Sequence, residues 1–433
     1  MVAEIILNSN AKELNRVFDY NIPETMAYKA TIGSRVFVQF GNRKELEEGF
    51  IINIKDESEF KLKDIQRIVN ENGISEEKVE LAKLMARRYF CNVSECIKLM
   101  LPPGTTTKII ENRVKEKNEN FVSIVNEILV ENDIEENKFK SAKQLRILKF
   151  LLDNGETNLA DLLLFTDTTR DAVKSLEKKK YVVIEQKQVE RNPFLHKVEK
   201  KTSKLKFTDE QQYAYDEISF AMDKNKYGEY LIYGVTGSGK TEIYLQLIEN
   251  ALRNNKTSIM LVPEISLTPQ TVDRFIARFG EENIAVLHSK LSIGERFDQW
   301  NKIKNGQAKI VIGARSAIFA PIKDLGIIII DEEHDSSYKS ESTPRYNAKD
   351  IARYLCKDNI PLVLGSATPD TSSLYRTMQK ESVLLRLNKR ANSSTLPEIE
   401  VIDLREELSK KNKSMLSEKL QEAIKENLEV LIN

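Results

Sequence analysis

The segment that most constrains this chain is residues 234–241, which read G-V-T-G-S-G-K-T. An apolar run at residues 230–233 precedes it, and we expect a helix to begin at Lys240. Glycines let backbone N–H groups approach phosphate oxygens, and a helix N-terminus favours an anion. The segment therefore predicts a nucleoside triphosphate site, with Lys240 at the β- and γ-phosphates and Thr241 on magnesium. The residues expected around the phosphates are Gly234, Val235, Thr236, Gly237, Ser238, Gly239, Lys240 and Thr241.

A second motif, residues 331–334, reads D-E-E-H and follows the apolar run 327–330. Ligands of α/β sheets bind at the carboxyl ends of the strands, so these carboxylates are expected beside the phosphate loop. We expect Asp331 to hold magnesium and Glu332 to orient the attacking water, with a solvated acidic turn as the alternative. His334 is expected to couple the nucleotide state to the substrate of the motor, or else to be an ordinary surface histidine.

Residues 365–369 read G-S-A-T-P, and the short hydroxyl side chains of Ser366 and Thr368 can link the acidic motif to that substrate. From Phe207 onward, short apolar runs alternate with helical segments, which indicates a parallel sheet with helices on both faces. The expected strands are residues 230–233, 258–262, 284–287, 310–312, 327–330 and 362–364.

Residues 1–104 alternate apolar and polar positions in short runs, which predicts a small β-rich domain. Its expected strands are residues 5–7, 18–22, 34–40 and 49–54, and a helix is expected at residues 76–89. Residues 110–140 are highly charged, and we interpret them as a linker or lead-in.

Residues 141–206 contain three predicted helices, around 145–152, 158–164 and 170–180, and then a strand at 181–185. This order is typical of a winged-helix domain. Residues 170–206 hold twelve basic and five acidic residues, which predicts a DNA-binding surface or, alternatively, a solvated charged face.

The 433 residues suffice for two to four domains, and 66 basic and 66 acidic residues leave no net charge. A nucleic-acid partner would therefore have to be bound by local basic patches. No apolar run approaches the roughly 18 residues of a membrane span, and Glu4 in a start without basic residues argues against a secretory signal. Cys91, Cys96 and Cys356 fit a reducing cytosol, and simple thiols are favoured over a metal site for the first two.

These segments, in this order, resemble superfamily 2 DNA helicases, and more closely the primosomal protein N′ family, the PriA replication-restart helicases. Residues 261–270 are similar to that family's motif Ia, residues 313–321 to its motif Ib, and residues 331–338 with 344–346 to its acidic box and aromatic-rich loop. Residues 210–211 resemble its adenine-reading segment, and residues 3–41 resemble its 3′-end-binding domain. The resemblance covers essentially the whole chain and implies a multidomain α/β fold ending in a RecA-like lobe.

The resemblance also implies a role for each matching residue. Contacts with the phosphates of a tracking DNA strand are implied for Thr268, Gln270, Arg315 and Ser316. Sensing of DNA by stacking or cation contacts, relayed to Glu332, is implied for Tyr338, Arg345 and Tyr346, with ordinary packing as the alternative for the two tyrosines. A pocket for the 3′ end of a nascent strand is implied for Phe18, Asp19 and Gly41, with plain core packing as the alternative for Phe18. Gln211 would contact adenine, and Gln66 stands where a family lysine is expected.

The implied function is an ATP-dependent 3′-to-5′ DNA helicase of replication restart, which recognises stalled forks and D-loops. The implied cofactors are ATP and Mg²⁺. The implied partners are branched and single-stranded DNA, single-strand-binding protein and primosome proteins, in the cytoplasm and without a membrane. Another superfamily 2 translocase is the rival interpretation, against which the Phe18–Asp19 unit argues.

The chain departs from the family in two places. It has no C-x-x-C pair, so the zinc that the family binds is not expected here. It also stops at Asn433, before the second motor lobe, whose arginine at the γ-phosphate is worth on the order of 10³ to 10⁵ in rate. We therefore expect a truncated chain, and a catalytically weak fork-binding fragment is the alternative function. The expected divisions are 1–104 (3′-end-binding domain), 105–206 (linker and winged helix), 207–390 (helicase lobe 1) and 391–433 (connection to a zinc region and lobe 2).

Overall fold

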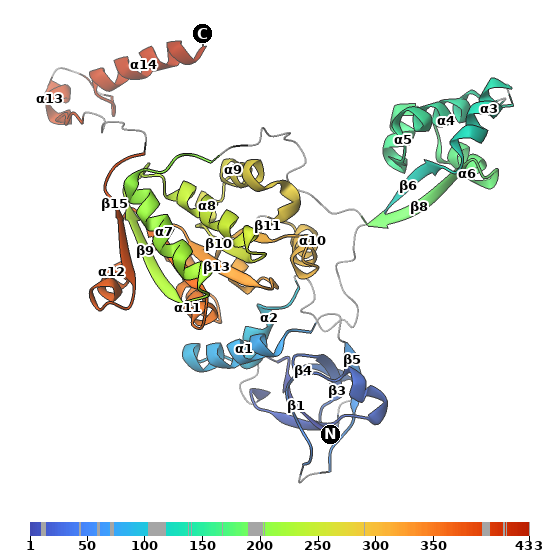
Figure 1. The fold of residues 1–433 in the computed structure, drawn as a ribbon, viewed down its shortest axis with the longest axis horizontal. Helices are drawn as coiled ribbons and strands as arrows, with labels where there is room; N and C mark the ends of the chain where they lie inside the picture. The colour runs from blue at the N-terminus through green and yellow to red at the C-terminus, as the bar shows by residue number, and fades with distance from the viewer. Residues whose placement is uncertain are drawn as a thin grey trace. The chain divides into compact units, whose positions relative to one another are not determined.

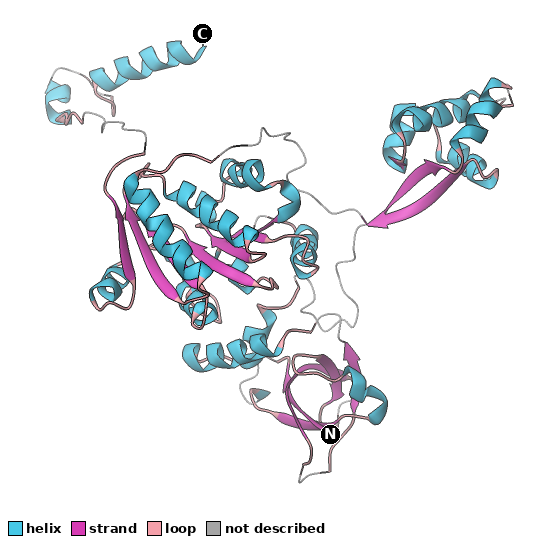
Figure 2. Cartoon of the chain, viewed as in Figure 1, coloured by secondary structure: helices cyan, strands magenta, loops and turns pink. Residues whose placement is uncertain are grey.

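A computed structural model describes residues 1–9, 14–42, 45–58, 61–69, 73–102, 118–136, 138–139, 141–166, 168–188, 202, 204–289, 291–391, 399–409, 412 and 414–432. The chain forms two compact units, residues 1–389 and residues 390–433 (Figure 1). The described residues of the first unit build three sheets (Figure 2). The second unit contains α13 (Leu404–Ser409) and α14 (Glu418–Ile432).

The N-terminal domain is an antiparallel sheet of order β2-β1-β4-β3-β5 followed by two helices. Strand β1 is buried on both faces, because Ile5 lies in the core of the sheet while Ile6 joins a cluster that includes Val79 of α1. The β-rich domain and its helix are confirmed, and β5 and α2 are additional elements. The elements are β1 (Val2–Leu7), β2 (Phe18–Asn21), η2 (Glu24–Lys29), β3 (Arg35–Gln39), β4 (Leu46–Lys55), β5 (Ile65–Val69), α1 (Glu76–Tyr89) and α2 (Val93–Lys98).

The middle domain packs four helices around a three-stranded sheet of order β7-β6-β8, and its helix–helix–helix–strand order is that of the predicted winged helix. The interpretation of residues 110–140 as a linker is wrong for residues 118–136. Strand β6 pairs with β8, and Val122 and Val130 lie in the domain core. The pairing partner of β6, strand β8, comes after four further helices, so no local pattern predicts the pairing. The elements are β6 (Asn118–Ile124), α3 (Glu127–Glu135), α4 (Ala142–Asn154), β7 (Thr157–Asn158), α5 (Leu159–Thr166), α6 (Arg170–Lys178) and β8 (Val182–Gln188).

Much of the basic segment that follows β8, residues 189–201 and 203, lies outside the described residues. Four of the twelve basic residues predicted to form a charged surface lie there, while the described residues of the range 170–206 hold eight basic and three acidic residues. Within that part, α6 carries basic residues at Arg170, Lys174 and Lys178, while Val173 and Leu176 are fully buried. The buried pair confirms the predicted inward face of this helix.

The third sheet has seven parallel strands in the order β11-β12-β10-β13-β14-β9-β15, with helices on both faces (Figure 2). Strand β13 shows why both faces are covered, since Ile328 and Ile330 join one apolar cluster while Ile327 and Ile329 join the other. This is the predicted RecA-like lobe, with β15 as an additional edge strand. The strands are β9 (Gly228–Gly234), β10 (Thr257–Leu261), β11 (Ile284–Leu287), β12 (Ile310–Gly313), β13 (Leu325–Ile330), β14 (Pro361–Ser366) and β15 (Val383–Leu387).

The helices of this lobe connect successive strands. The α-helices are α7 (Asp209–Asp223), α8 (Lys240–Arg253), α9 (Pro269–Phe279), α10 (Ile293–Lys304), α11 (Ala348–Cys356) and α12 (Thr371–Met378). The short 3₁₀ turns are η3 (Glu264–Ser266), η4 (Glu281–Asn283), η5 (Arg315–Phe319) and η6 (Ser336–Tyr338). Among the described residues, no helix is both long and apolar enough to cross a membrane.

The strand order brings three loops together. Strand β14 lies between β13 and β9, so the loops that follow these three strands meet at the carboxyl edge of the sheet. The phosphate loop follows β9, the acidic motif follows β13, and the hydroxyl segment follows β14. Three segments that are far apart in the sequence therefore form one site.

Helix α1 joins the N-terminal domain to this lobe. Lys78 Nζ donates hydrogen bonds to the Phe319 carbonyl at 2.9 Å and to the Ala320 carbonyl at 3.2 Å. At the other end of the helix, the Arg88 guanidinium bonds the Asp350 carboxylate at 3.0 Å. The contact therefore reaches η5, which carries the motif Ib residues.

Candidate functional site

The phosphate loop has the backbone that its glycines allow. Gly237 (φ +81°) and Gly239 (φ +83°) are left-handed, and Gly239 caps the N-terminus of α8. At Gly234 a Cβ atom would lie 2.5 Å from Ser238 Oγ, so only glycine fits there. Lys240 is largely buried and its Nζ donates to the Gly234 carbonyl at 2.8 Å, which holds the amine against the loop.

Gln211 contacts the same loop from the preceding helix. Its Oε1 accepts a hydrogen bond from Thr208 N at 2.9 Å, completing a capping box at the start of α7. Its Nε2 donates to the Ser238 carbonyl at 2.7 Å, and the side chain is buried. The structure thus places Gln211 at the phosphate loop, with its amide already bonded on both sides.

Asp331 lies at the end of β13 with its carboxylate held by Tyr244. The Tyr244 hydroxyl, on α8, donates to Asp331 Oδ1 at 3.0 Å. Burial raises the pKa of Asp331, and the negative charge of the neighbouring Glu332 raises it further. The hydrogen bond from Tyr244 and the positive charge of Lys240 lower this pKa in part. Because burial penalises the charged form of this carboxyl despite the nearby Lys240, a divalent cation bound beside it would stabilise that form. Tyr244 was not singled out in the sequence, because it reads as an ordinary helix residue.

Glu332, His334, Ser366 and Thr368 form one cluster. His334 Nδ1 lies 3.7 Å from Glu332 Oε2 and 2.8 Å from Ser366 Oγ. Thr368 N donates to Ser366 Oγ at 3.0 Å, and Thr368 Oγ1 lies 3.5 Å from His334 Nε2. The residues expected to couple the acidic motif to the substrate are therefore in contact. The backbone of Glu332 is left-handed (φ +44°), a conformation that is uncommon for a non-glycine residue and is found at functional turns.

Glu333, the second glutamate of the motif, is a structural anchor that the sequence did not reveal. It is fully buried and bonded to Lys349 Nζ at 2.7 Å, Asp370 N at 2.7 Å and Ser373 Oγ at 2.8 Å. Its own backbone N donates to the Gly365 carbonyl at 3.0 Å. Glu333 therefore fixes the acidic motif to β14 and to the helices that follow.

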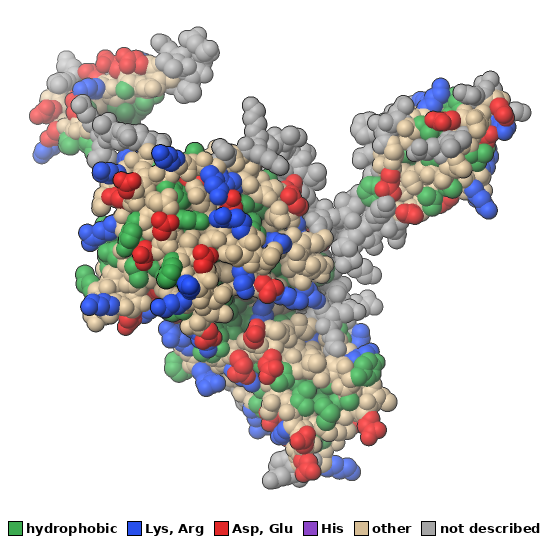
Figure 3. All heavy atoms as spheres, in the orientation of Figure 1, with side chains coloured by type: hydrophobic (Ala, Val, Ile, Leu, Met, Phe, Trp, Pro, Cys, Tyr) green, Lys and Arg blue, Asp and Glu red, His purple; other side chains and the backbone are tan. Residues whose placement is uncertain are grey.

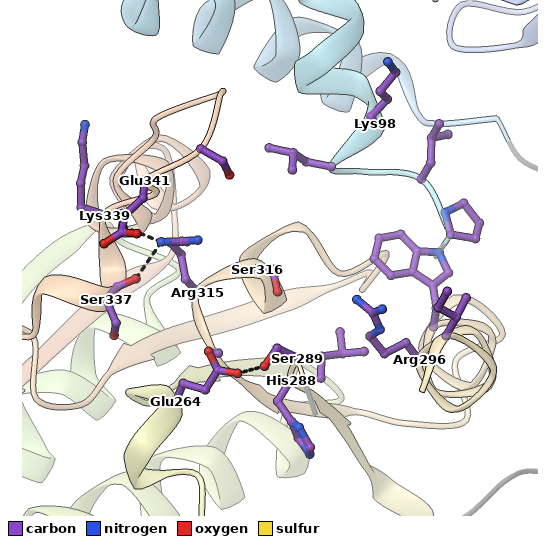
Figure 4. Close-up of a pocket in the computed structure, with 18 of the residues that line it drawn as sticks. Lys98, Glu264, His288, Ser289, Arg296, Arg315, Ser316, Ser337, Lys339 and Glu341 are labelled. Atoms are coloured by element: carbon purple, nitrogen blue, oxygen red, sulfur yellow. Dashed lines mark hydrogen bonds between the residues drawn. The ribbon is translucent and has the colours of Figure 1, made fainter. Parts of the chain in front are cut away.

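The residues expected at the DNA phosphates lie at the same end of the lobe. Thr268 is the N-cap of α9, with its Oγ1 accepting from Thr271 N, and Gln270 is exposed one position into that helix. Ser316 is exposed on η5. Arg315 Nη1 donates to the carbonyls of Ser337 and Lys339, which ties η5 to the aromatic-rich loop (Figure 4).

The aromatic-rich loop buries both of its tyrosines. Tyr338 is 1% exposed and its hydroxyl donates to the Asp331 carbonyl at 2.6 Å. Tyr346 is 2% exposed and packs edge-on against Phe319, with Arg315 over its ring. Both rings are covered by protein, which is the arrangement expected from the alternative of ordinary packing. Of the three residues, Arg345 alone is exposed.

Phe18 and Asp19 lie on the edge strand β2 of the N-terminal sheet, and Gly41 follows β3. The Phe18 ring is half-buried and meets the Phe40 ring edge-on, with centroids 5.0 Å apart. Asp19 Oδ2 bonds Lys55 Nζ at 2.7 Å. Gly41 is exposed and left-handed (φ +57°), and Lys63 donates to its carbonyl. Gln66, which stands where a family lysine is expected, bonds the Asp64 carbonyl at 3.1 Å.

The three cysteines are free thiols. Cys96 and Cys356 are buried free thiols and Cys91 is half-buried, with 3.5 Å between the sulfurs of Cys91 and Cys96. In the described part of the chain, no group of three or more His, Cys, Asp or Glu side chains could hold a metal ion. Figure 3 shows basic and acidic side chains interspersed over the visible face.

Two family models match this chain. Residues 4–102 match one described as a 3′DNA-binding domain (3′BD), and residues 204–371 match one described as the res subunit of type III restriction enzymes. The first matched range contains Phe18, Asp19 and Gly41, and the second contains the phosphate loop, the acidic motif and the hydroxyl segment.

Among curated proteins, the replication restart protein PriA of Bacillus subtilis (strain 168) is 36% identical, over 98% of this chain and 60% of that protein. The protein of the same name from Chlamydia trachomatis serovar D is 34% identical, over 99% of this chain and 57% of that protein. A solved structure of RecG bound to a three-way DNA junction is 24% identical, covers 42% of this chain and 24% of that chain, and has a TM-score of 0.34. The chain spans about 60% of the length of the curated relatives that it matches.

Proposed function

The chain belongs to the PriA family of replication restart proteins, and on that premise we propose that it carries the nucleotide-binding lobe and the DNA-end-binding domain of an ATP-dependent 3′-to-5′ helicase. The observation that carries the proposal is the meeting of Lys240, Asp331 and Glu332 at one edge of the sheet, with His334 and Ser366 beside them. Recognition of stalled forks and D-loops, and binding of single-strand-binding protein and primosome proteins in the cytoplasm, belong to the same proposal. So do the domain divisions near residues 104 and 206.

The residues at the phosphate loop fit a magnesium–ATP complex. Ser238 Oγ is buried without a hydrogen-bond partner among the described residues, and a Cβ built at Gly237 would meet open space. Backbone N–H groups of the loop and Lys240 would hold the phosphates, while Thr241 and Asp331 would hold Mg²⁺. When bound, the nucleotide supplies the phosphoanhydride bond whose hydrolysis drives the motor.

The acidic motif would perform two tasks in this site. Glu332 would orient and polarise the attacking water, since its carboxylate is half-exposed beside the buried Asp331. His334 contacts both Glu332 and Ser366, so a shift of the hydroxyl segment would move the carboxylate that orients the water. Coupling between DNA and hydrolysis would therefore run through His334, Ser366 and Thr368.

The tracking strand would lie across the exposed ends of η5 and α9. Thr268, Gln270, Arg315 and Ser316 offer hydroxyl, amide and guanidinium groups to phosphates there, which position a strand without reading its bases. Arg345 would add a further cation contact. The buried Tyr338 would position Asp331, and the buried Tyr346 would position Arg315.

The test is ATP hydrolysis by the 433-residue chain with and without forked DNA, with Lys240→Ala as the control. We expect nucleotide binding that is lost in the variant, and turnover that rises when forked DNA is added. Turnover that is equal in the two proteins would refute the assignment of the loop. Fork binding without any turnover would favour the alternative function, a fork-binding fragment with a weak site that needs the γ-phosphate arginine of a second lobe.

The end-binding pocket has its own test. A fork with a free 3′-hydroxyl is expected to bind more tightly than the same fork with a 3′-phosphate, because Asp19 can accept a hydrogen bond from a hydroxyl and repels a phosphate. Asp19→Asn should remove most of this preference, while Asp216→Asn, on α7, should leave it unchanged. Equal binding of both forks by the original chain would favour another superfamily 2 translocase.

A further inference from the structure

A groove of about 1320 Å³ separates the end of the N-terminal domain from the helicase lobe (Figure 4). One wall is formed by Leu99, Leu101 and Pro102, which follow α2. The opposite side is formed by segments of the lobe, among them α10 with Arg296 and η5 with Ser316. Its volume exceeds the roughly 300–1,000 Å³ of pockets for small ligands, so the groove fits a segment of a polymer.

The side chains of the groove favour an anion. Its basic side chains outnumber its acidic ones by four to two, and five serines add hydroxyl donors. One of the acids, Glu264, accepts a hydrogen bond from the Ser289 hydroxyl. The basic residues are Lys98, Arg296, Arg315 and Lys339, the acidic ones Glu264 and Glu341, and the serines Ser289, Ser316, Ser336, Ser337 and Ser342.

Two guanidinium groups frame the groove. Arg296 reaches in from α10 and Arg315 from η5, with Ser316 between them in Figure 4. The Nε atoms of both arginines are buried and have no hydrogen-bond partner in the described part of the chain. The planar fork of a guanidinium group matches the geometry of phosphate oxygens, so Arg296 can bind one, whereas Arg315 already donates through Nη1 to two backbone carbonyls.

We infer that Arg296 binds a backbone phosphate of single-stranded DNA, so that the strand held at Arg315 and Ser316 continues between α10 and the end of the N-terminal domain. This inference rests on the proposed function, since it extends the path of the tracking strand. The apolar wall of Leu99, Leu101 and Pro102 faces the lobe across the groove and can cover bases and sugars that a duplex would not expose. The N-terminal domain is thereby part of the strand's path in addition to binding a 3′ end.

The test is the affinity of the 433-residue chain for a fluorescent oligothymidylate over a series of salt concentrations. Each phosphate contact contributes about −0.7 to the slope of log K against log salt for a single strand. Arg296→Ala should weaken binding about tenfold at low salt and make the slope shallower by about 0.7. Arg296→Lys, which keeps the charge, should retain the slope. Arg253→Ala, which removes an exposed arginine at the end of α8, is the matched control and should bind as the original chain does.

The outcomes separate this inference from the proposed function. If Arg315→Ala loses affinity while Arg296→Ala keeps both affinity and slope, the inference is overturned and the proposed function stands. If both variants bind the oligonucleotide as the original chain does and DNA does not stimulate hydrolysis, the proposed function fails as well. If Arg296→Ala loses binding of a poly-glutamate peptide but not of the oligonucleotide, the groove takes an acidic peptide, and the inference is wrong. Melting temperatures of all variants establish that they are folded.

Discussion

Replacing Gly365 by alanine is predicted to break the contact that holds the magnesium carboxylate. The added methyl group would lie 1.7 Å from Tyr244 Oη and 2.9 Å from its Cζ, whereas non-bonded heavy atoms rest at about 3.5 Å. Tyr244 is fully buried, so its ring cannot turn into solvent to escape the methyl group. The hydroxyl must instead leave Asp331 Oδ1, to which it donates at 3.0 Å.

The cost follows from these contacts. Overpacking a filled core costs about 1–3 kcal/mol, and a buried oxygen left without its donor costs about 1–3 kcal/mol more. Tyr244→Phe alone incurs only the cost of leaving the Asp331 oxygen without its donor. It also removes the Tyr244 Oη atom, which would lie 1.7 Å from the added methyl group. In that background the nearest atom to the methyl group is Cζ at 2.9 Å, so Gly365→Ala needs a shift of a few tenths of an ångström and should cost about 1 kcal/mol. With about 2 kcal/mol for each of the two costs, the double variant should lose about 3 kcal/mol where the single losses sum to about 6, a coupling of about 3 kcal/mol.

The assay is urea unfolding followed by the fluorescence of Trp300, which is the sole tryptophan of the sequence and lies buried in the same lobe. A double-mutant cycle of Gly365→Ala and Tyr244→Phe gives the coupling free energy. Tyr375→Phe, which deletes an exposed hydroxyl on α12, is the matched control and should show no coupling with Gly365→Ala. Free energies that add to within about 0.5 kcal/mol would show that Gly365 does not accommodate the Tyr244 hydroxyl.

Three further predictions concern buried charges. Lys349→Met leaves the fully buried Glu333 without its cation and should lower the free energy of unfolding by about 3–5 kcal/mol. In urea titrations, adding Glu333→Gln to this variant should recover part of the loss. No recovery would contradict the pairing of Lys349 with Glu333. Asp331→Asn should abolish hydrolysis yet raise the melting temperature at pH 7, because burial raises the pKa of this carboxyl and so penalises its charged form in the folded state. The difference in melting temperature should shrink as the pH falls through the raised pKa towards 3.8, and a difference that does not change with pH would refute the cause. Burial lowers the pKa of Lys78 from 10.5 to about 8, so the unfolded chain binds more protons between these values and the free energy of unfolding should rise with pH across that window. Lys78→Met should remove this rise in urea titrations at pH 8 and 10, and a variant that keeps it would show that other groups cause it.

The parts of the site that the sequence predicts are those whose chemistry lies in neighbouring residues. The phosphate loop needs glycines, Lys240 and Thr241 in one turn, and the acidic motif follows a strand whose four isoleucines face both sides of a sheet. Both signals are local, so fold and site could be predicted there. Strand alternation likewise predicts most of the two larger sheets. The short edge strands β5 and β15 lack a long apolar run, and their pairing partners identify them.

The missed residues act across long separations in the sequence. Tyr244 bonds Asp331 87 positions later, and Glu333 bonds Ser373 40 positions later. Each has an ordinary local context, a tyrosine inside a helix or a glutamate beside another glutamate. Tyr244 acquires its role because α8 packs against β13, and Glu333 because β13 pairs with β14. The same reason explains why the sequence leaves two alternatives open for Tyr338 and Tyr346. Aromatic residues in a loop can stack on a ligand or fill a core, and burial, which sequence spacing does not reveal, decides between them.

The contacts at η5 connect the two ends of the proposed DNA path. Lys78 of α1 donates to the last carbonyl of η5, and Arg315 at the first residue of η5 bonds the loop that carries Tyr338. Tyr338 in turn donates to the carbonyl of Asp331. Every link is a hydrogen bond between side chain and backbone, so a displacement of η5 by a bound strand cannot leave both α1 and the acidic motif in place. Because Glu332 follows Asp331 directly, occupancy of the groove and the position of the water-orienting carboxylate are expected to change together.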